Sequence, residues 1–188
     1  MRSWSASVAN QIPQADVLGY SMGAGVALRT AIQHPHLVRK LVVVSFPFQS
    51  AGFFPDIAAQ QKQLGPHLAV SMQQSPMYQL YSGLAPRVED WPRLVGRLGE
   101  LMGREFDWTD ELGGIQARVM LLVGDADMLP PAHAAQFFAL LGGGHSDGHW
   151  NRSGMTKHRL AILPGTTHYD ILQSPLLLPS IAPFLAEG

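Results

Sequence analysis

The sequence predicts an α/β fold built on a parallel sheet of about four strands with flanking helices. Short apolar runs without polar alternation recur along the chain, as expected of strands that are covered on both faces. Stretches with helical spacing of apolar residues separate these runs. Strand alternating with helix favours parallel pairing through right-handed crossovers.

Each element follows from a local pattern. The predicted strands are DVLGY (16–20), LVVVS (41–45), VMLLV (119–123) and LAIL (160–163). A helix from Met22 to about Gln33 stops at His34-Pro35, because proline forces the residue before it out of the helical region. Further helices are predicted over residues 131–141, which ends at three glycines, and 175–186. Residues 3–12 are predicted to end a helix, and residues 145–157 to form a polar loop.

Residues 46–110 have a different character. Six prolines are scattered through them, with helical patches between, and WPRLVGRLGELMG (91–103) has apolar residues at helical spacing. We interpret this region as a small helical cap inserted into one α/β domain that spans residues 1–188.

Composition excludes several classes of protein. Hydrophobic residues make up 46% of the chain and charged residues 14%, which suits a buried core and not a disordered chain. The net charge of −1 gives no indication of a nucleic-acid partner, and no apolar run is long enough to span a membrane. The absence of cysteine excludes disulfides and thiolate chemistry. With no signal peptide at Met1–Asn10, we expect a cytoplasmic protein without a cofactor or metal.

Gly19-Tyr20-Ser21-Met22-Gly23 matches the pattern G-x-S-x-G, and its setting makes it informative. It follows a predicted buried strand and opens a predicted helix, as a nucleophile elbow requires. In so tight a turn, side chains two positions either side of the serine would clash, which predicts glycine at both positions. Ser21 is then exposed at the positive end of the helix, and the Met22 amide is a candidate oxyanion donor.

A serine nucleophile needs a base, and the base needs an acid that orients it. On this architecture the order along the chain is serine, acid, histidine. Asp125 and Asp127 follow the third predicted strand, and His168 follows the fourth. The carboxyl ends of parallel strands share one edge of the sheet, so these groups are expected to converge with Ser21.

Three stretches that begin at Ala15, Arg118 and Arg159 resemble bacterial proteins of the α/β-hydrolase fold, in the broad esterase and lipase-like group. The resemblance covers nearly the whole chain. It implies Ser21 as nucleophile, His168 as base and, because the family places its acid three residues after a glycine, Asp127 and not Asp125 as acid. We expect Asp125 to support the turn instead.

The resemblance also implies a departure. In the family the serine motif lies much further into the domain, so the chain corresponds to the C-terminal portion of the fold and apparently lacks the N-terminal part. The loop with an H-G motif, which supplies a second oxyanion donor, is not found here. Strand 16–20 becomes an unpaired apolar edge. Either the chain is a fragment of a longer gene product, or it is expected to form a homo-oligomer, with a homodimer through the Asp16–Tyr20 edge as the simplest form.

The remaining candidates have alternative interpretations. His34, His36, His67 and His158 are expected at the surface, His133 lies in a helix, and His145 and His149 lie in a polar loop that gives poor support for a metal site. Eight apolar residues either line an acyl pocket or form the core of the cap, and these are Phe46, Phe48, Phe53, Phe54, Met72, Met77, Tyr78 and Tyr81.

The sequence thus predicts a serine hydrolase that cleaves a small-molecule carboxylic ester through an acyl-enzyme. One alternative is a truncated, weakly active or non-catalytic remnant that acts through assembly or binding. Another is the same chemistry applied to a C–C bond or a lactone.

Overall fold

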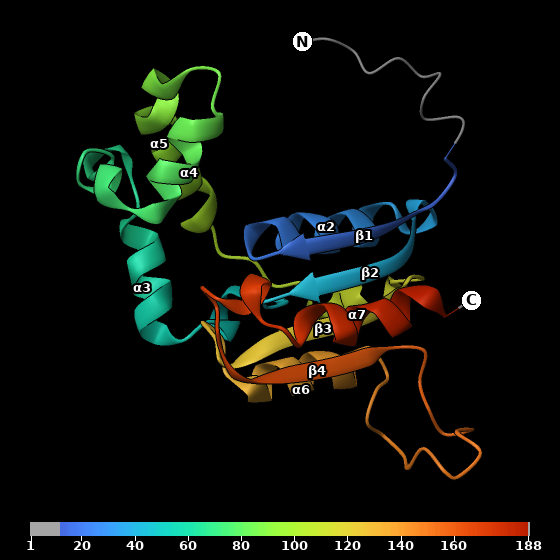
Figure 1. Ribbon diagram of the computed structural model, residues 1–188. Coiled ribbons are helices and arrows are strands. Elements are labelled where there is room, and N and C mark those ends of the chain that lie inside the picture. Colours follow the sequence, from blue (N-terminus) through green and yellow to red (C-terminus); the bar gives the residue numbers. More distant parts are fainter. Residues whose placement is uncertain (1–11, 188) are drawn as a thin grey trace. The chain divides into compact units, whose positions relative to one another are not determined.

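The computed structural model describes residues 12–187 and has a four-stranded parallel sheet at its centre (Figure 1). The strands lie in chain order, each paired with the next. They are β1 (Ala15–Tyr20), β2 (Val38–Val44), β3 (Arg118–Ala126) and β4 (Arg159–Thr167). This architecture confirms the predicted fold class.

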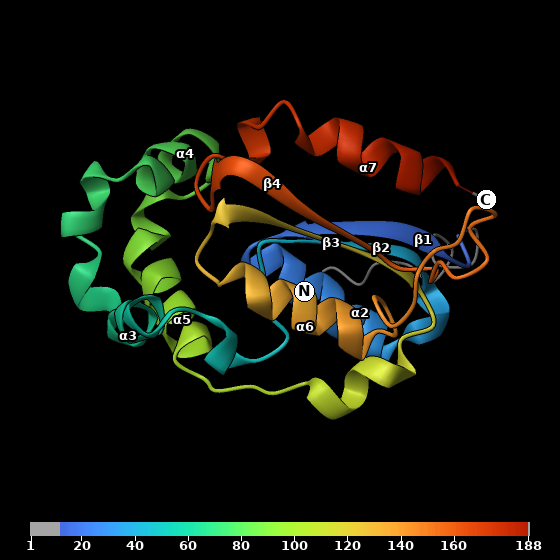
Figure 2. The ribbon, with the colours of Figure 1, turned by 90° about the horizontal axis from the view of Figure 1, so that it is seen from below.

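Helices cover both faces of the sheet (Figure 2). On one face, α2 (Met22–Gln33) and α6 (Pro131–Leu140) pack on alternate strand residues such as Leu41 and Val43. On the other face, α7 (Leu177–Ala186) packs on Val42 and Val44. Successive residues of a strand point to opposite faces, so two covered faces explain why β2 is apolar without alternation.

β3 and β4 extend further at their carboxyl ends than their apolar runs predicted, whereas β2 begins at Val38, before its predicted start at Leu41, and ends at Val44 and not at Ser45. Residues 124–126 were expected in a loop but continue β3, and β4 continues to Thr167, with a bulge in the pairing between Gly124 and Ala126. The backbone is held there because the Asp125 carboxylate accepts N–H bonds from Gly165 (3.0 Å) and Thr166 (3.1 Å) across the strand pair. The Pro164-Gly165 pair is typical of a turn, so sequence reasoning ended both strands too early.

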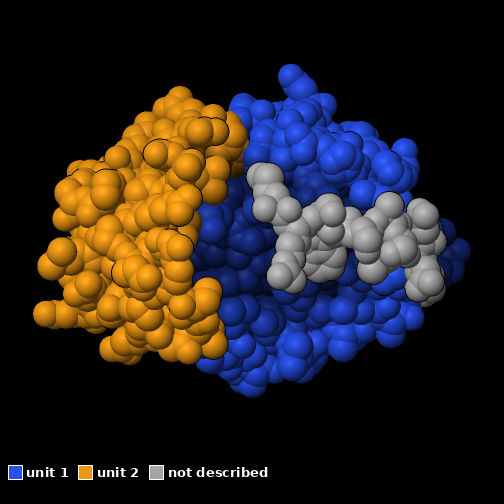
Figure 3. All heavy atoms as spheres, turned by 90° about the horizontal axis from the view of Figure 1, so that it is seen from above, with its two compact units in different colours: residues 1–52, 107–188 blue, residues 53–106 orange. Residues whose placement is uncertain are grey.

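The chain divides into two compact units, which Figure 3 colours separately. The first consists of residues 1–52 and 107–188 and contains the sheet. The second, residues 53–106, contains α3 (Pro55–Gln63), α4 (Pro76–Leu84) and α5 (Trp91–Met102). In its core, the Trp91 ring packs on Tyr78 and Tyr81, and Trp91 Nε1 donates to the Ala69 carbonyl (2.8 Å). The predicted helical end at residues 3–12 lies outside the described residues, apart from Ile12.

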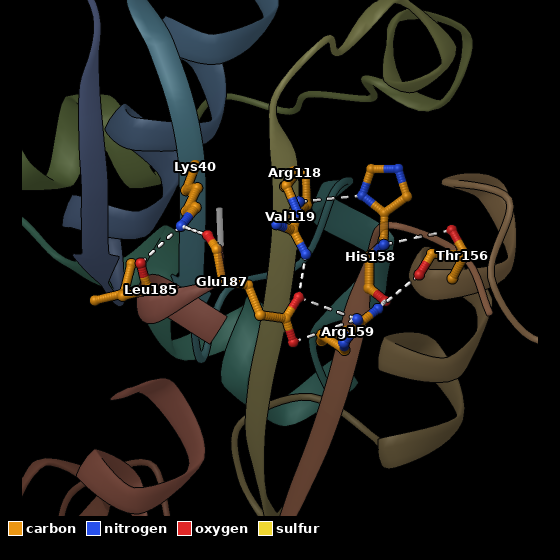
Figure 4. A network of polar contacts seen from close by, with 8 residues as sticks. All are labelled: Lys40, Arg118, Val119, Thr156, His158, Arg159, Leu185 and Glu187. Atoms are coloured by element: carbon orange, nitrogen blue, oxygen red, sulfur yellow. Dashed lines mark hydrogen bonds and ion pairs between the residues drawn. The ribbon is translucent and has the colours of Figure 1, made fainter. Parts of the chain in front are cut away.

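A polar network fastens α7 where the strands begin (Figure 4). The buried Lys40 donates from Nζ to the carbonyl oxygens of Leu185 (2.6 Å) and Glu187. Arg118 and Arg159 both pair with the Glu187 carboxylate. These cations belong to β2, β3 and β4, so one end of a helix is tied to three strands.

Candidate active site

Ser21 lies at the sharp turn between β1 and α2. Its backbone has φ 52° and ψ −128°, a left-handed conformation that is rare outside glycine. The Ser21 N–H donates to the Val44 carbonyl of β2 (2.9 Å), and the Ser21 carbonyl accepts from Ala24 (2.8 Å). These bonds hold the serine on the elbow in spite of the backbone strain.

The two motif glycines have different roles. A Cβ at Gly19 would lie 2.3 Å from the Gly23 carbonyl oxygen and 2.5 Å from Ala24 Cα, so this position requires glycine. A Cβ at Gly23 would meet nothing within 4 Å among the described residues. The prediction that Gly23 avoids the same clash is therefore wrong for this structure, because Gly23 is exposed and a Cβ there would meet open space.

His168 lies between Ser21 and Asp127. The ring atom Nε2 is 3.0 Å from Ser21 Oγ, and Nδ1 is 3.0 Å from Asp127 Oδ1. The Asp127 and His168 side chains are almost fully buried. Ser21, Asp127 and His168 directly follow β1, β3 and β4, so their side chains meet at the carboxyl edge of the sheet. The order of the predicted strands indicated this edge.

Four donors surround the Asp127 carboxylate. Oδ1 accepts from the Met128 N–H (2.7 Å) and faces His168, while Oδ2 accepts from Ser45 Oγ (2.5 Å) and the Gly124 N–H (3.1 Å). Burial alone raises the pKa of Asp127, but the hydrogen bonds outweigh it and the net pKa is lowered. Asp127 is therefore a carboxylate at neutral pH.

Asp125 has a separate place. Its carboxylate accepts from Gly165 and Thr166, and these two backbone N–H groups lower the pKa of Asp125. It thus supports the backbone of the neighbouring strand β4, and the N–H groups of Asp125 and Ala126 also help to lower its pKa.

Met22 is the first residue of α2. The amides of a helix's first turn have no acceptor inside the helix, and they lie at its positive end. The Met22 N–H therefore has no acceptor within α2, and it lies one residue after Ser21.

Sequence reasoning missed two polar residues next to this site. Tyr20 donates its hydroxyl to the His168 carbonyl (2.6 Å), and burial, followed by the charge of Asp127, raises the pKa of this phenol. Ser45 donates to Asp127 as described above. The available signal was position, since Tyr20 and Ser45 lie at the carboxyl ends of two neighbouring strands.

The histidines outside the site differ from expectation in one case. His34, His36 and His67 are exposed as predicted, but His158 is buried, and the surface prediction is wrong. Its Nδ1 accepts the Val119 N–H (3.1 Å), and burial lowers the pKa of His158 to about 4. His133 is also buried, stacked on Phe48, and burial lowers its pKa to about 4.

Within the described residues, no three His, Cys, Asp or Glu side chains are grouped to hold a metal ion. His149 pairs with Asp147 in the 145–157 loop at 3.3 Å.

None of the helices in residues 12–187 is both long and apolar enough to cross a membrane.

The eight candidate pocket residues separate into different environments. Phe48 is fully buried and Phe46 packs against the same core, in the unit that holds the sheet. Met72, Tyr78 and Tyr81 pack around Trp91 in the other unit. Five of the eight thus contribute to core packing, Phe53 is half-buried, and Phe54 and Met77 are exposed.

Comparison with known proteins identifies the family. A model of the alpha/beta hydrolase family matches residues 2–178. The chain belongs to the alpha/beta hydrolase family. This confirms the resemblance to the α/β-hydrolase fold.

Solved structures agree on the fold of this alpha/beta hydrolase. MGS-M2, an alpha/beta hydrolase enzyme from a Medee basin deep-sea metagenome library, is similar with a TM-score of 0.62 and 17% identity, over 96% of this chain and 68% of that chain. The enol-lactonase from Burkholderia xenovorans LB400 is similar with a TM-score of 0.58 and 16% identity, over 95% of this chain and 68% of that chain. Roughly a third of each solved chain therefore has no counterpart in this sequence.

One curated relative is similar over a shorter stretch. The 2-hydroxymuconate semialdehyde hydrolase of Pseudomonas sp. (strain CF600) is 41% identical over 64 residues, which cover 29% of this chain. The chain thus spans 23% of that relative's length in the match.

Proposed function

We propose that this alpha/beta hydrolase is a serine hydrolase that cleaves a carboxylic ester through an acyl-enzyme. Ser21 is the nucleophile, His168 the general base and Asp127 the acid that orients His168. The observation that supports this most directly is the pair of 3.0 Å contacts that His168 makes, one from each ring nitrogen. Unlike the family match, these contacts concern particular atoms with complementary roles.

The proposed reaction has two halves. The Ser21 hydroxyl attacks the ester carbonyl while His168 Nε2 takes its proton, and the Asp127 carboxylate stabilises the resulting imidazolium through Nδ1–H. The imidazolium then protonates the departing alkoxide, which leaves as alcohol. In the second half, His168 deprotonates a water molecule that attacks the acyl group and releases Ser21 and a carboxylic acid.

The tetrahedral oxyanion needs hydrogen-bond donors. We assign one to the Met22 N–H. Removing one such donor from a serine hydrolase costs about 3 kcal/mol of transition-state stabilisation. If Met22 acts alone, ester turnover is expected to be correspondingly slow.

The names of similar proteins favour a carbonyl substrate without choosing among esters. An enol-lactonase and an esterase from Thermogutta terrifontis share the fold. A lactone is a cyclic ester, so the same nucleophile and base serve both. We therefore extend the proposed substrate class to lactones.

Labelling with a fluorophosphonate tests the proposal, since the probe needs an activated serine and no particular substrate. We expect one label per chain, located on Ser21, and hydrolysis of a short-chain p-nitrophenyl ester. Ser21→Ala is expected to abolish both. Persistent labelling of this variant would show that another serine is the nucleophile, and an unlabelled folded wild type would contradict the function itself.

The second candidate function is assembly or binding with little catalysis. The observation in its favour is the edge position of β1, which pairs only with β2 among the described residues and leaves Leu18 half exposed. Exposed strand edges favour pairing with another chain. Weak ester turnover together with a stable oligomer would support this function.

A further inference from the structure

Ser45 combines three properties that are seldom found in one residue. It directly follows β2, it is 1% exposed, and its backbone φ is 57°. Its side chain donates to Asp127 Oδ2 at 2.5 Å, and its N–H donates to the Leu122 carbonyl of β3 at 2.8 Å. A buried serine with a left-handed backbone is thus held by one bond from the main chain and one from the side chain.

The strained backbone conformation indicates that the serine at position 45 has a specific role. A non-glycine residue in the left-handed region is destabilised and persists only where surrounding contacts fix it. Glycine would fit this turn without strain, but it would bring no hydroxyl to Asp127.

The hydroxyl completes the environment of Asp127. Each carboxylate oxygen has two partners, and Oδ2 would keep only the Gly124 N–H without Ser45. A carboxylate held at both oxygens cannot rotate, so Oδ1 stays directed at His168 Nδ1. The same bond favours the ionised form of Asp127.

Ser45 is also connected to the elbow. The Ser21 N–H donates to the carbonyl of Val44, the residue just before Ser45. The end of β2 therefore contacts both ends of the Ser21–His168–Asp127 series. Because Ser45 is buried, it cannot compete with Ser21 as a nucleophile.

We propose that Ser45 is a positioning residue, which fixes the Asp127 carboxylate so that Oδ1 accepts the hydrogen bond from His168 Nδ1–H. The proposal rests on the proposed function, since it deepens the role of the same site. Ser45 touches no reacting atom and acts through Asp127.

Two variants separate the hydroxyl from the backbone. Ser45→Ala removes the hydroxyl and keeps the strained turn, while Ser45→Gly removes the hydroxyl and relieves the strain. We expect both to fold and to react with the fluorophosphonate about tenfold or more slowly, the scale of losing a hydrogen bond to a charged group. Ser180→Ala is the control, because Ser180 Oγ donates to a carbonyl on the exposed surface of α7. It should react at the wild-type rate.

Proton NMR provides a readout that does not depend on activity. A proton held between an imidazole nitrogen and a carboxylate gives a signal far downfield, and we expect it to shift or broaden in both Ser45 variants but not in Ser180→Ala. Folded variants with wild-type reaction rates and an unchanged signal would overturn the proposal. If Ser45→Ala does not fold, Ser45→Gly decides. If the wild type is not labelled, the proposed function fails while the NMR comparison still tests the role of Ser45.

Discussion

At the scale of single residues, the site consists of side chains whose hydrogen bonds leave each with one orientation. Asp127 orients the His168 ring through Nδ1, and the Tyr20 hydroxyl holds the His168 main chain at its carbonyl oxygen. Asp127 is directed by four donors. Such restraint is what an acid–base pair needs if its proton transfers are to begin from a productive geometry.

Two neighbouring aspartates allow the assignment of the acid to be tested. Asp127→Asn removes the carboxylate that faces His168 Nδ1, and we expect ester hydrolysis and probe labelling to fall at least about a hundredfold. Asp125→Asn should leave labelling within a few-fold of wild type and lower the unfolding midpoint, because it weakens acceptance from Gly165 and Thr166. Labelling rates and thermal melts of both variants make the comparison, and the reverse pattern would assign the acid to Asp125.

Residue type and spacing led to the three central residues of the candidate site, but not to the residues that hydrogen-bond to them. The motif and the order of strands led to Ser21, His168 and an aspartate after β3. The position of Ser45 after β2 was a signal for it, but its role also depends on a left-handed turn and on a contact 82 residues away, and neither leaves a local pattern. His158 was misassigned for the same reason, since its burial depends on pairing with the Val119 N–H 39 residues away.

At the scale of elements, the elbow depends on how closely β1 approaches α2. The Gly19 position admits no Cβ, whereas the Gly23 position does. We expect Gly19→Ala to destabilise the fold by at least about 1–3 kcal/mol, the range for overpacking, and to abolish labelling. Gly23→Ala should keep labelling and stabilise the fold by up to about 1 kcal/mol, as alanine replaces glycine in a helix. Urea unfolding measures both, and equal losses in the two variants would contradict the close approach of β1 to α2 at Gly19.

Two buried histidines predict how stability depends on pH. Burial lowers the pKa values of His133 and His158 to about 4, so both stay neutral in the folded state while the unfolded chain takes up protons near pH 6.5. The free energy of unfolding is therefore at its full value above pH 6.5 and falls as the pH drops toward 4, by at most roughly 3 kcal/mol for each histidine.

His133→Phe tests this dependence, because phenylalanine keeps a ring for stacking on Phe48. Urea titrations at pH 7 and pH 5 should show a smaller loss of stability on acidification than in the wild type. The exposed His36→Gln serves as control for losing a histidine as such. A wild-type pH dependence in His133→Phe would contradict the predicted neutral His133.

At the scale of the whole molecule, β1 is an edge strand with apolar residues beside it, and Val26 on the adjoining α2 is largely exposed. We therefore expect the purified chain of 20.5 kDa to associate, with a dimer as the simplest form. Light scattering checks this. Leu18→Glu, which places a charge on β1, should shift the mass toward the monomer, whereas Leu178→Glu on the exposed side of α7 should not. A stable wild-type monomer would refute the prediction.

The sequence separation of 147 between Ser21 and His168 has a consequence for synthesis. A ribosome that has just released the elbow must still add all of the second unit, β3, α6 and β4 before the base exists. Under the proposed mechanism, Ser21 has no group to take its proton throughout that interval. The same mechanism therefore implies that the nascent chain cannot cleave an ester until β4 has been made.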